Sequence, residues 1–246
     1  MESSPFISVI IPAVNEAASL PTALNHLRAE SVTHEIIAAV GPSYDGTASL
    51  AEAGGCVVVE SLRRHRARQM NLGAARARGE VLLFLHADSL LPEGALEKIA
   101  DALMDARITG GAFARRYDVR SRFLRATCLL AELRGRIFGV FLGDQAIFVR
   151  REVFGAIGGF QEMEIFEDFD FSQRMRRVGR TITLRPPIVS SGRRFYPEGP
   201  LAKTGRDFLM TCRYLWGESP DKLAMKFRRR AKGLTPGFIL ALRPLR

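Results

Sequence analysis

Short apolar runs alternate with amphipathic segments through the first hundred residues of the chain. Apolar runs predict four strands, at residues 7–11, 35–40, 57–59 and 81–85. Leucine spacing or helix-forming composition predicts four helices, at residues 20–27, 47–53, 67–77 and from Pro92 to about 103. Pro12 is expected to end the first strand, and Asn15 to cap the first helix. This alternation favours an α/β fold of parallel strands joined by helical crossovers.

After Gly110 the alternation gives way to a mixed pattern. An extended segment is expected at 111–119, one or two amphipathic helices at 123–141, a strand at 145–149, a helix at 167–178 and a strand at 181–184. The acids that open the helix at 167 suit the positive end of its dipole. From Leu201 the pattern is helical and basic, with a loose tail from about Gly233.

The composition is that of a globular protein with a substantial core. The chain has 246 residues, of which 47% are hydrophobic, enough for one large or two small domains. Its three cysteines lie far apart and show neither zinc spacing nor a disulfide framework. No secretory signal pattern opens the chain, and no run of about 18 apolar residues occurs. We therefore expect reduced thiols and a cytoplasmic location.

The net charge of +10 is compatible with nucleic acid, an anionic membrane or a phosphorylated substrate as partner. The arginines cluster at residues 63–68, 115–125, 174–180 and 226–230, far apart in sequence. Solvated helix faces are the simplest interpretation of each cluster. The chain has no helix-turn-helix, zinc-finger or RNP signature, so nucleic acid is not expected as a partner.

One carboxylate stands where an apolar strand ends. The run that finishes at Leu85 is followed by His86-Ala87-Asp88. A buried parallel strand delivers such a residue to the carboxyl edge of the sheet, where open α/β folds bind ligands. A carboxylate there suits a hard divalent cation, and such a cation can hold a diphosphate. The alternative is that Asp88 caps the helix that begins near Pro92.

Four motifs in register resemble those of family 2 glycosyltransferases. They are Ile7-Ser8-Val9-Ile10-Ile11-Pro12 with Asn15-Glu16, Ser43-x-Asp45-Gly46-Thr47, His86-Ala87-Asp88, and Glu167-Asp168. The resemblance covers roughly residues 6–185. Two further segments, 66–74 and 143–145, are similar to the bacterial radical-SAM/selenodomain-associated subgroup. The resemblance implies a GT-A fold, with a Rossmann-like mixed sheet flanked by helices. It also implies a nucleotide-diphosphate sugar donor, a divalent metal (Mg²⁺ or Mn²⁺) and usually inversion at the anomeric carbon.

The resemblance also assigns roles to residues. Asp88 takes the place of the direct metal ligand, while His86 replaces the first acid of the family's Asp-x-Asp pattern and either contacts the donor or packs. Asp168 takes the place of the general base, with Glu167 as the alternative if the register is off by one. The predicted donor-binding residues are Pro12, Asn15, Glu16, Asp45, Arg68, Gln69, His86 and Asp144.

Two departures from the family pattern concern the donor. Val40 stands where the family commonly has an acid at the end of the second strand, so uridine cannot be assumed as the base. The family's Gln-x-x-Arg-Trp element is absent, and Ser191-Gly192-Arg193-Arg194 stands in its place. Arg193 or Arg194 is a candidate for contact with phosphate. The missing element, like the lack of a spanning segment, argues against a processive polymer synthase.

The predicted function is transfer of one sugar to a small-molecule or lipid hydroxyl. We expect a GT-A domain over residues 1–200, with a donor half at about 1–110 and an acceptor half at about 111–200. Residues 201–246 are expected to form a basic helical extension packed on it. Residues 122–141 and 203–230 mix apolar and basic side chains and are candidates for peripheral contact with the inner face of a membrane. The alternatives are a catalytically degenerate GT-A protein and a basic anion-binding or nucleic-acid-binding module.

Overall fold

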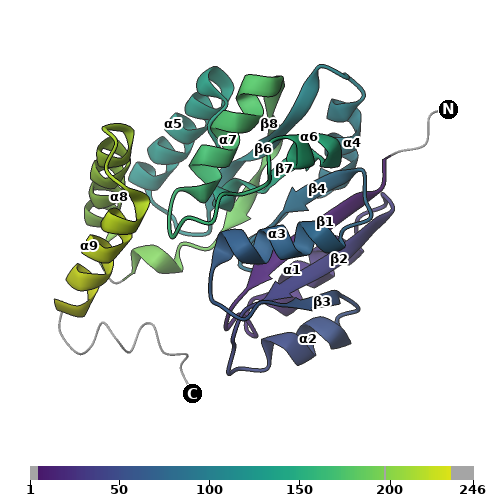
Figure 1. Ribbon diagram of the computed structural model, residues 1–246, viewed down its shortest axis with the longest axis horizontal. Helices are drawn as coiled ribbons and strands as arrows, with labels where there is room; N and C mark the ends of the chain where they lie inside the picture. Colours follow the sequence, from purple (N-terminus) through teal and green to yellow (C-terminus); the bar gives the residue numbers. More distant parts are fainter. Residues whose placement is uncertain (1–4, 197, 234–246) are drawn as a thin grey trace.

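The computed structural model describes residues 5–196 and 198–233 and places a mixed sheet between two layers of helices (Figure 1). The strands are β1 (Ile7–Ala13), β2 (His34–Val40), β3 (Val57–Glu60), β4 (Val81–Phe84), β5 (Ser89–Leu90), β6 (Ile108–Tyr117), β7 (Ile147–Arg150) and β8 (Arg180–Ser190). Across the sheet they run in the order β3-β2-β1-β4-β7-β6-β8-β5.

The helices follow the strands closely along the chain. They are α1 (Leu20–Arg28), α2 (Thr47–Ala53), α3 (Arg66–Arg76), α4 (Ala95–Leu103), α5 (Arg122–Phe138), α6 (Arg151–Ala156), α7 (Glu167–Val178), α8 (Pro200–Leu215) and α9 (Pro220–Gly233). Short 3₁₀ turns occupy Gly143–Gln145 and Arg193–Phe195. The predicted α/β class is confirmed.

The first half of the sheet is parallel, as the alternation predicts. β1 pairs in parallel with β2 and β4, and β2 pairs in parallel with β3. β7 pairs antiparallel with both β4 and β6, while β6 and β8 are parallel. The carboxyl ends of β1, β2 and β4 therefore meet at one edge of the sheet, and their loops are brought together there.

Alternate side chains of β1 divide the core between the two faces of the sheet. Val9 and Ile11 pack in a cluster that includes residues of α1 and α4, whereas Ile10 packs with residues of α3 and α7. Full burial of an aliphatic side chain contributes about 1.5–3 kcal/mol, so this division stabilises both layers. A Cβ at Gly73 would lie 2.5 Å from Ile10 Cγ2, so glycine there lets α3 lie close against β1. That close packing places the first turn of α3 at the sheet edge.

Two expectations at the end of β1 are wrong. Pro12 does not end the strand, which continues to Ala13. Beyond Ile10 only β2 pairs with it, so Pro12 lies outside the β4 ladder, where a missing N–H costs less. Asn15 does not cap α1, which begins at Leu20 after Ser19. Asn15 instead adopts a left-handed conformation with φ 54° in the loop.

The second half differs more from the sequence pattern. Residues 123–141 hold a single helix, α5, and the last long strand, β8, is 11 residues long rather than four. Two short elements, β5 and α6, have no counterpart in the predictions. The expected helical character after Leu201 is present in α8 and α9. The predicted loose tail lies almost wholly outside the described residues.

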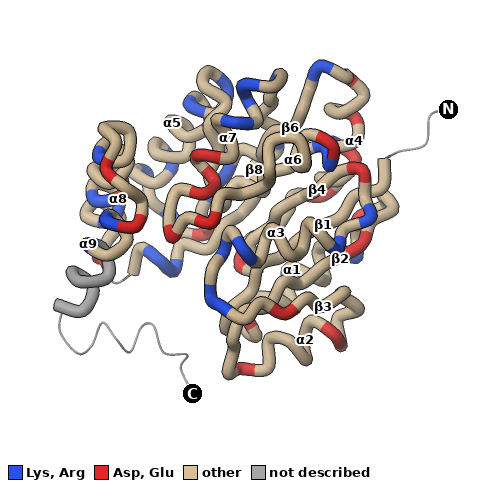
Figure 2. Tube along the Cα trace, in the orientation of Figure 1, with Lys and Arg blue, Asp and Glu red and all other residues tan. Residues whose placement is uncertain are grey.

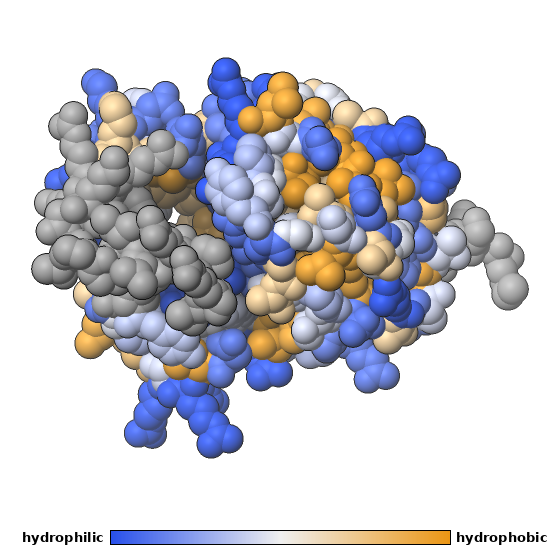
Figure 3. Space-filling view, turned by 90° about the horizontal axis from the view of Figure 1, so that it is seen from below, coloured by the Kyte–Doolittle hydropathy of each residue, from blue (hydrophilic) through white to orange (hydrophobic). Residues whose placement is uncertain are grey.

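α8 and α9 lie side by side at the edge of the molecule, next to α5 (Figure 1). Large hydrophobic side chains on these helices are exposed, among them Leu130, Phe138, Phe208 and Leu215. On the face of the molecule seen from below, hydrophobic residues lie in several groups interspersed with hydrophilic ones (Figure 3). Within residues 5–196 and 198–233, no helix combines the length and apolar character that crossing a membrane requires.

Candidate active site

A cavity of about 250 Å³ opens at the carboxyl ends of β1 and β4, and we call it the cleft. It is lined by Pro12, Ala13, Val14, Glu16, Arg66, Gln69, His86, Ala87 and Asp88. Five of the predicted donor or metal residues are thus brought together from three separate segments of the chain. The cleft lies where parallel α/β sheets present loops to ligands, as the strand order requires.

Two carboxylates of the cleft converge on one positive charge. Arg193 Nη2 donates to Glu16 Oε1 at 2.6 Å and lies 3.2 Å from Asp88 Oδ2. Burial raises the pKa of Asp88, and the nearby Arg193 only partly opposes that rise. Asp88 therefore points into the cleft as predicted, and its charge is incompletely compensated.

This pair of acids fits a divalent cation of the kind implied by the family resemblance. Among the described residues no group of three or more His, Cys, Asp and Glu side chains is gathered to hold a metal. Mg²⁺, however, is commonly bound through one or two carboxylates together with the phosphates of a substrate. Glu16 Oε1 and Asp88 Oδ2 both face the same cationic nitrogen, so the two carboxylates converge on one point of the cleft.

His86 lies between the cleft and the loop before β7. Its Nε2 is buried and has no hydrogen-bond partner among the described residues. Burial lowers the pKa of His86 to about 3, and the Arg66 charge adds to this effect, so the imidazole is neutral at physiological pH. A Cβ at Gly143 would lie only 2.6 Å from Nε2, so a glycine is needed beside the ring. A neutral ring with one unpaired nitrogen suits a hydroxyl ligand.

Asp168 lies near the same face of Gly143 as His86, because a Cβ at Gly143 would be 3.4 Å from Asp168 Oδ2 and 2.6 Å from His86 Nε2. The Gly143 N–H donates to Asp168 Oδ2 at 2.6 Å, and the Phe169 N–H donates to Oδ1 at 2.7 Å. Burial raises the pKa of Asp168, and the adjacent Glu167 carboxylate raises it further. Such a raised pKa makes the carboxylate a better proton acceptor.

The two acids of Glu167-Asp168 have different partners. Glu167 is buried and accepts a hydrogen bond from Arg66 Nε, whereas Asp168 Oδ2 lies 3.7 Å from Arg66 Nη2. The acidic segment that opens α7 lies beside the basic start of α3 (Figure 2). Phe166, just before this pair, has φ 69°, an unusual conformation for an aromatic residue and one that concentrates at functional sites.

A buried ion cluster surrounds Asp144, which does not line the cleft. Tyr117 Oη donates to Asp144 Oδ2 at 3.0 Å, and Arg194 Nη2 donates to the same oxygen at 2.6 Å. Arg115 Nη1 also donates to both carboxylate oxygens. Burial alone would raise the pKa of Asp144, but Arg115 and Arg194 lower it well below the ordinary value. Arg115 and Tyr117 were not among the predicted residues, and no local sequence pattern marks them.

The loop after β1 is shaped by two of the predicted donor residues. Asp45 accepts from the Ala17 N–H at 2.9 Å and from both the N–H and the hydroxyl of Thr47. Asn15 Oδ1 accepts from the Tyr44 N–H at 2.9 Å. These contacts hold the backbone beside Glu16, so Asn15 and Asp45 form the support of the cleft rather than its lining.

The first turns of α3 present Arg66 and Gln69 to the cleft, but not Arg68. Gln69 Nε2 donates to the carbonyls of Ala13 at 3.0 Å and Ala39 at 2.7 Å, joining the ends of β1 and β2. Arg68 Nη1 instead lies 3.7 Å from Glu162. Arg66 and Gln69 enter the cleft together because residues three apart share a helix face.

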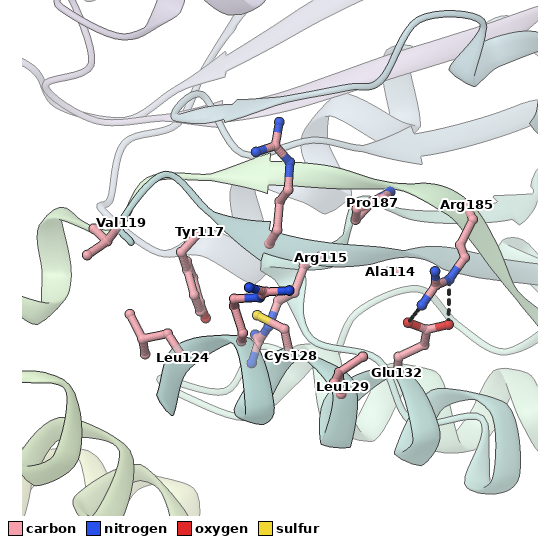
Figure 4. A pocket seen from close by; sticks show the side chains of 12 residues that line it. Ala114, Arg115, Tyr117, Val119, Leu124, Cys128, Leu129, Glu132, Arg185 and Pro187 are labelled. Carbon is pink, nitrogen blue, oxygen red and sulfur yellow. Dashed lines mark hydrogen bonds and ion pairs between the residues drawn. The ribbon is translucent and has the colours of Figure 1, made fainter. Parts of the chain in front are cut away.

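A second cavity of about 180 Å³ lies between α5 and the strands β6 and β8 (Figure 4). Its lining includes the apolar side chains of Val119, Leu124 and Leu129. Glu132 and Arg185 form an ion pair at one end of it. Arg115 and Tyr117 belong both to this lining and to the Asp144 cluster, so the cluster adjoins the second cavity.

Comparison with known families agrees with this geometry. The family model described as "Glycosyl transferase family 2" matches residues 8–177. The chain belongs to glycosyltransferase family 2. A curated relative, the PGL/p-HBAD biosynthesis glycosyltransferase of Mycobacterium bovis (strain BCG / Pasteur 1173P2), is 32% identical over 190 residues, 70% of each chain. The protein is therefore a glycosyltransferase, as the motifs predicted.

Solved structures show the same fold. The mannosyltransferase PcManGT from Pyrobaculum calidifontis, in complex with GDP-Man and Mn²⁺, matches with a TM-score of 0.67 at 21% identity. This match covers 89% of the present chain and 67% of PcManGT. S. aureus TarS 1-349 in complex with UDP-GlcNAc matches with a TM-score of 0.62 at 16% identity, covering 97% and 76% of the two chains. The predicted GT-A fold is confirmed.

Proposed function

We propose that this glycosyltransferase is a metal-dependent, inverting enzyme that moves one sugar from a nucleotide-diphosphate sugar to a hydroxyl acceptor. The observation that carries the proposal is the placement of two incompletely compensated carboxylates near His86. Asp88 lines the cleft together with His86, and Asp168 accepts a hydrogen bond from the Gly143 N–H beside the ring. A leaving diphosphate and an attacking hydroxyl need charge stabilisation and a base at two such separate points.

The leaving-group end of the site is assigned to Asp88 and Glu16. A divalent cation, Mg²⁺ or Mn²⁺, held by these carboxylates would offset the charge that develops on the departing diphosphate. The Mn²⁺ complex of PcManGT with GDP-Man supports this assignment. His86 Nε2 accepts a hydrogen bond from a hydroxyl of the donor, because the neutral ring has one unpaired nitrogen beside the cleft.

The nucleophilic end is assigned to Asp168. The acceptor oxygen attacks the anomeric carbon as its proton passes to an Asp168 carboxylate oxygen, and the bond from that carbon to the diphosphate breaks. Attack from the face opposite the leaving group inverts the anomeric carbon. Glu167 is the weaker candidate for the base because Arg66 already engages its carboxylate. The backbone N–H groups of Gly143 and Phe169 hold Asp168 in position.

The acceptor is a small molecule or lipid whose apolar part enters the second cavity. The apolar lining from Leu124 and Leu129 supports this assignment (Figure 4). Exposed hydrophobic residues on α5 and α8 support peripheral contact with the inner face of a membrane from the cytoplasm. Segments 66–74 and 143–145 support membership of the radical-SAM/selenodomain-associated subgroup. Residues 1–200 form the catalytic domain in this proposal, with 201–246 as its extension.

The proposal is tested by titrating nucleotide sugars, with GDP and UDP donors both present in the panel, into the protein with and without Mn²⁺. Binding is measured as heat flow, and turnover as released nucleotide diphosphate. Asp88→Ala is expected to weaken metal-dependent donor binding. Asp168→Asn is expected to bind donor normally and to lose about 10²–10⁴-fold in turnover, the usual contribution of a general base. Full turnover by Asp168→Asn would reject the base assignment, and donor binding without turnover in the unmodified protein would favour a degenerate enzyme.

A further inference from the structure

Arg193 occupies the position between the two carboxylates assigned to the metal. A single nitrogen, Nη2, approaches both Glu16 Oε1 at 2.6 Å and Asp88 Oδ2 at 3.2 Å. A metal ion bound by both of these oxygens would displace that nitrogen from them. The guanidinium and a divalent cation therefore compete for the same pair of acids.

The segment that carries Arg193 is anchored on both sides of it. The Ser191 N–H donates to the Asp88 carbonyl at 3.2 Å, and the Gly192 N–H donates to Asp118 Oδ1 at 2.7 Å. A Cβ at Gly192 would lie 2.2 Å from Val119 Cγ2, so the backbone lies close against the loop after β6. On the other side, Arg194 is bound to the buried Asp144. The backbone of the segment is thus fixed at the mouth of the cleft.

The Arg193 side chain itself is far less constrained. It is 51% exposed, against 10% for Arg115 in the neighbouring cluster. Its partners Glu16 and Asp88 are only 17% and 24% exposed, but the half-exposed guanidinium stays in contact with water and can change partners without being fully desolvated. A guanidinium that leaves two carboxylates at the mouth of a cleft can bind phosphate oxygens in a bidentate manner.

We propose that Arg193 is a built-in counter-cation that fills the metal position of the nucleotide-free protein and transfers to the diphosphate when metal and nucleotide bind. The inference rests on the proposed function. Its consequence is an order of assembly: the protein alone has little affinity for the metal, and nucleotide diphosphate and metal bind as a unit. By linkage, each ligand then raises the affinity for the other.

The test compares Mn²⁺ binding to nucleotide-free protein in three variants. Arg193→Gln removes the competing charge and is expected to raise Mn²⁺ affinity about five- to tenfold, the equivalent of about 1 kcal/mol. Arg193→Lys keeps the charge and is expected to remain within about twofold of the unmodified protein. Arg76→Gln removes one exposed charge at the last turn of α3 and serves as the control for net charge.

A second titration follows GDP and UDP without metal. Arg193→Gln is expected to weaken binding of the preferred nucleotide about fivefold, because a phosphate contact is lost. A merely structural role for Arg193 would not raise metal affinity while lowering nucleotide affinity. Equal Mn²⁺ affinity in Arg193→Gln, Arg76→Gln and the unmodified protein would overturn the inference.

The same measurements separate this inference from the proposed function. Mn²⁺ binding that depends on nucleotide but is unaffected by Arg193→Gln would reject only the role of Arg193. Failure of the unmodified protein to bind Mn²⁺ even with nucleotide present would reject the metal-dependent function itself, and the inference with it.

Discussion

Two adjacent arginines, Arg193 and Arg194, pair with two acid clusters that differ in burial and in the number of hydrogen-bond donors. Arg193 is half-exposed and pairs with Glu16 and Asp88 at the cleft. Arg194 binds Asp144, whose side chain is only 7% exposed and which also has Arg115 and Tyr117 as donors. The same residue types thus form an exchangeable pair at one position and a fixed network at the next. Burial and the number of partners, rather than residue type, decide which acid is free for a ligand.

The largest effect should come from breaking the buried cluster. Asp144→Ala leaves Arg115 and Arg194 without their carboxylate, and we expect a loss of about 3–5 kcal/mol in the free energy of unfolding. Urea denaturation followed by circular dichroism measures this loss. Asp105→Asn, which removes a carboxylate from an exposed pair with Arg107, is the matched control and should change stability little. A small effect of Asp144→Ala would mean that the two clusters do not differ as described.

The stability of the fold should depend on pH in opposite directions through Asp144 and through Asp88. The pKa of Asp144 is lowered, so its ionisation stabilises the fold above the ordinary value of 3.8, and this contribution is lost as pH falls through the lower folded pKa. The stability difference between the unmodified protein and Asp144→Asn should therefore narrow below pH 3.8. The pKa of Asp88 is raised, so its ionisation opposes folding, and a stabilising contribution present below 3.8 is lost as pH rises. Urea titrations of Asp144→Asn and Asp88→Asn at several pH values test both directions. The same pH dependence of unfolding free energy in the two variants would contradict the comparison.

A methyl group beside His86 and Asp168 should have an intermediate effect. A Cβ at Gly143 lies 2.6 Å from His86 Nε2 and 3.4 Å from Asp168 Oδ2, so Gly143→Ala is expected to cost about 1–3 kcal/mol through overpacking. Gly155→Ala in α6 is the control, because its Cβ would meet nothing within 4 Å. Thermal unfolding monitors both variants. Equal melting temperatures would show that His86 can move aside without cost.

The smallest effect on stability is expected at the cleft. Asp88→Asn removes an ionised group that burial disfavours, so the free energy of unfolding should change by less than about 1 kcal/mol. Metal-dependent donor binding should nevertheless fall, which the calorimetric titration of donor with Mn²⁺ measures. Severe destabilisation would instead place Asp88 among the structural acids, together with Asp144.

The parallel half of the fold could be predicted from the sequence because local and tertiary signals agree there. Buried strands such as β4 are apolar on both faces, and each is followed by a helix of clear spacing. The length of β8 could not be predicted, because Pro186 and Pro187 argue against a strand. The pairing with β6 shifts from Leu184 to Ile188, so the prolines fall in an irregularity of the ladder that tolerates them.

The site was predictable only where a motif is local. Asp88 and Glu167-Asp168 follow from short patterns and lie where those patterns place them. The donors to Asp144 come from Arg115, 29 residues away, and Arg194, 50 residues away, through a contact that no spacing encodes. The sequence does not distinguish Arg66 from Arg68, because both belong to the same basic run and only the orientation of α3 decides which of them faces the cleft.

The double hydrogen bond of Gln69 limits what the cleft can recognise. Both N–H groups of its amide donate to the carbonyls of Ala13 and Ala39, so only the amide oxygen is left to bind a ligand. A nucleobase that meets this side chain must present an N–H of its own, as uracil does at N3 and guanine at N1. Cytosine has a bare ring nitrogen at N3, so on that edge only its N4 amino group could donate to this oxygen.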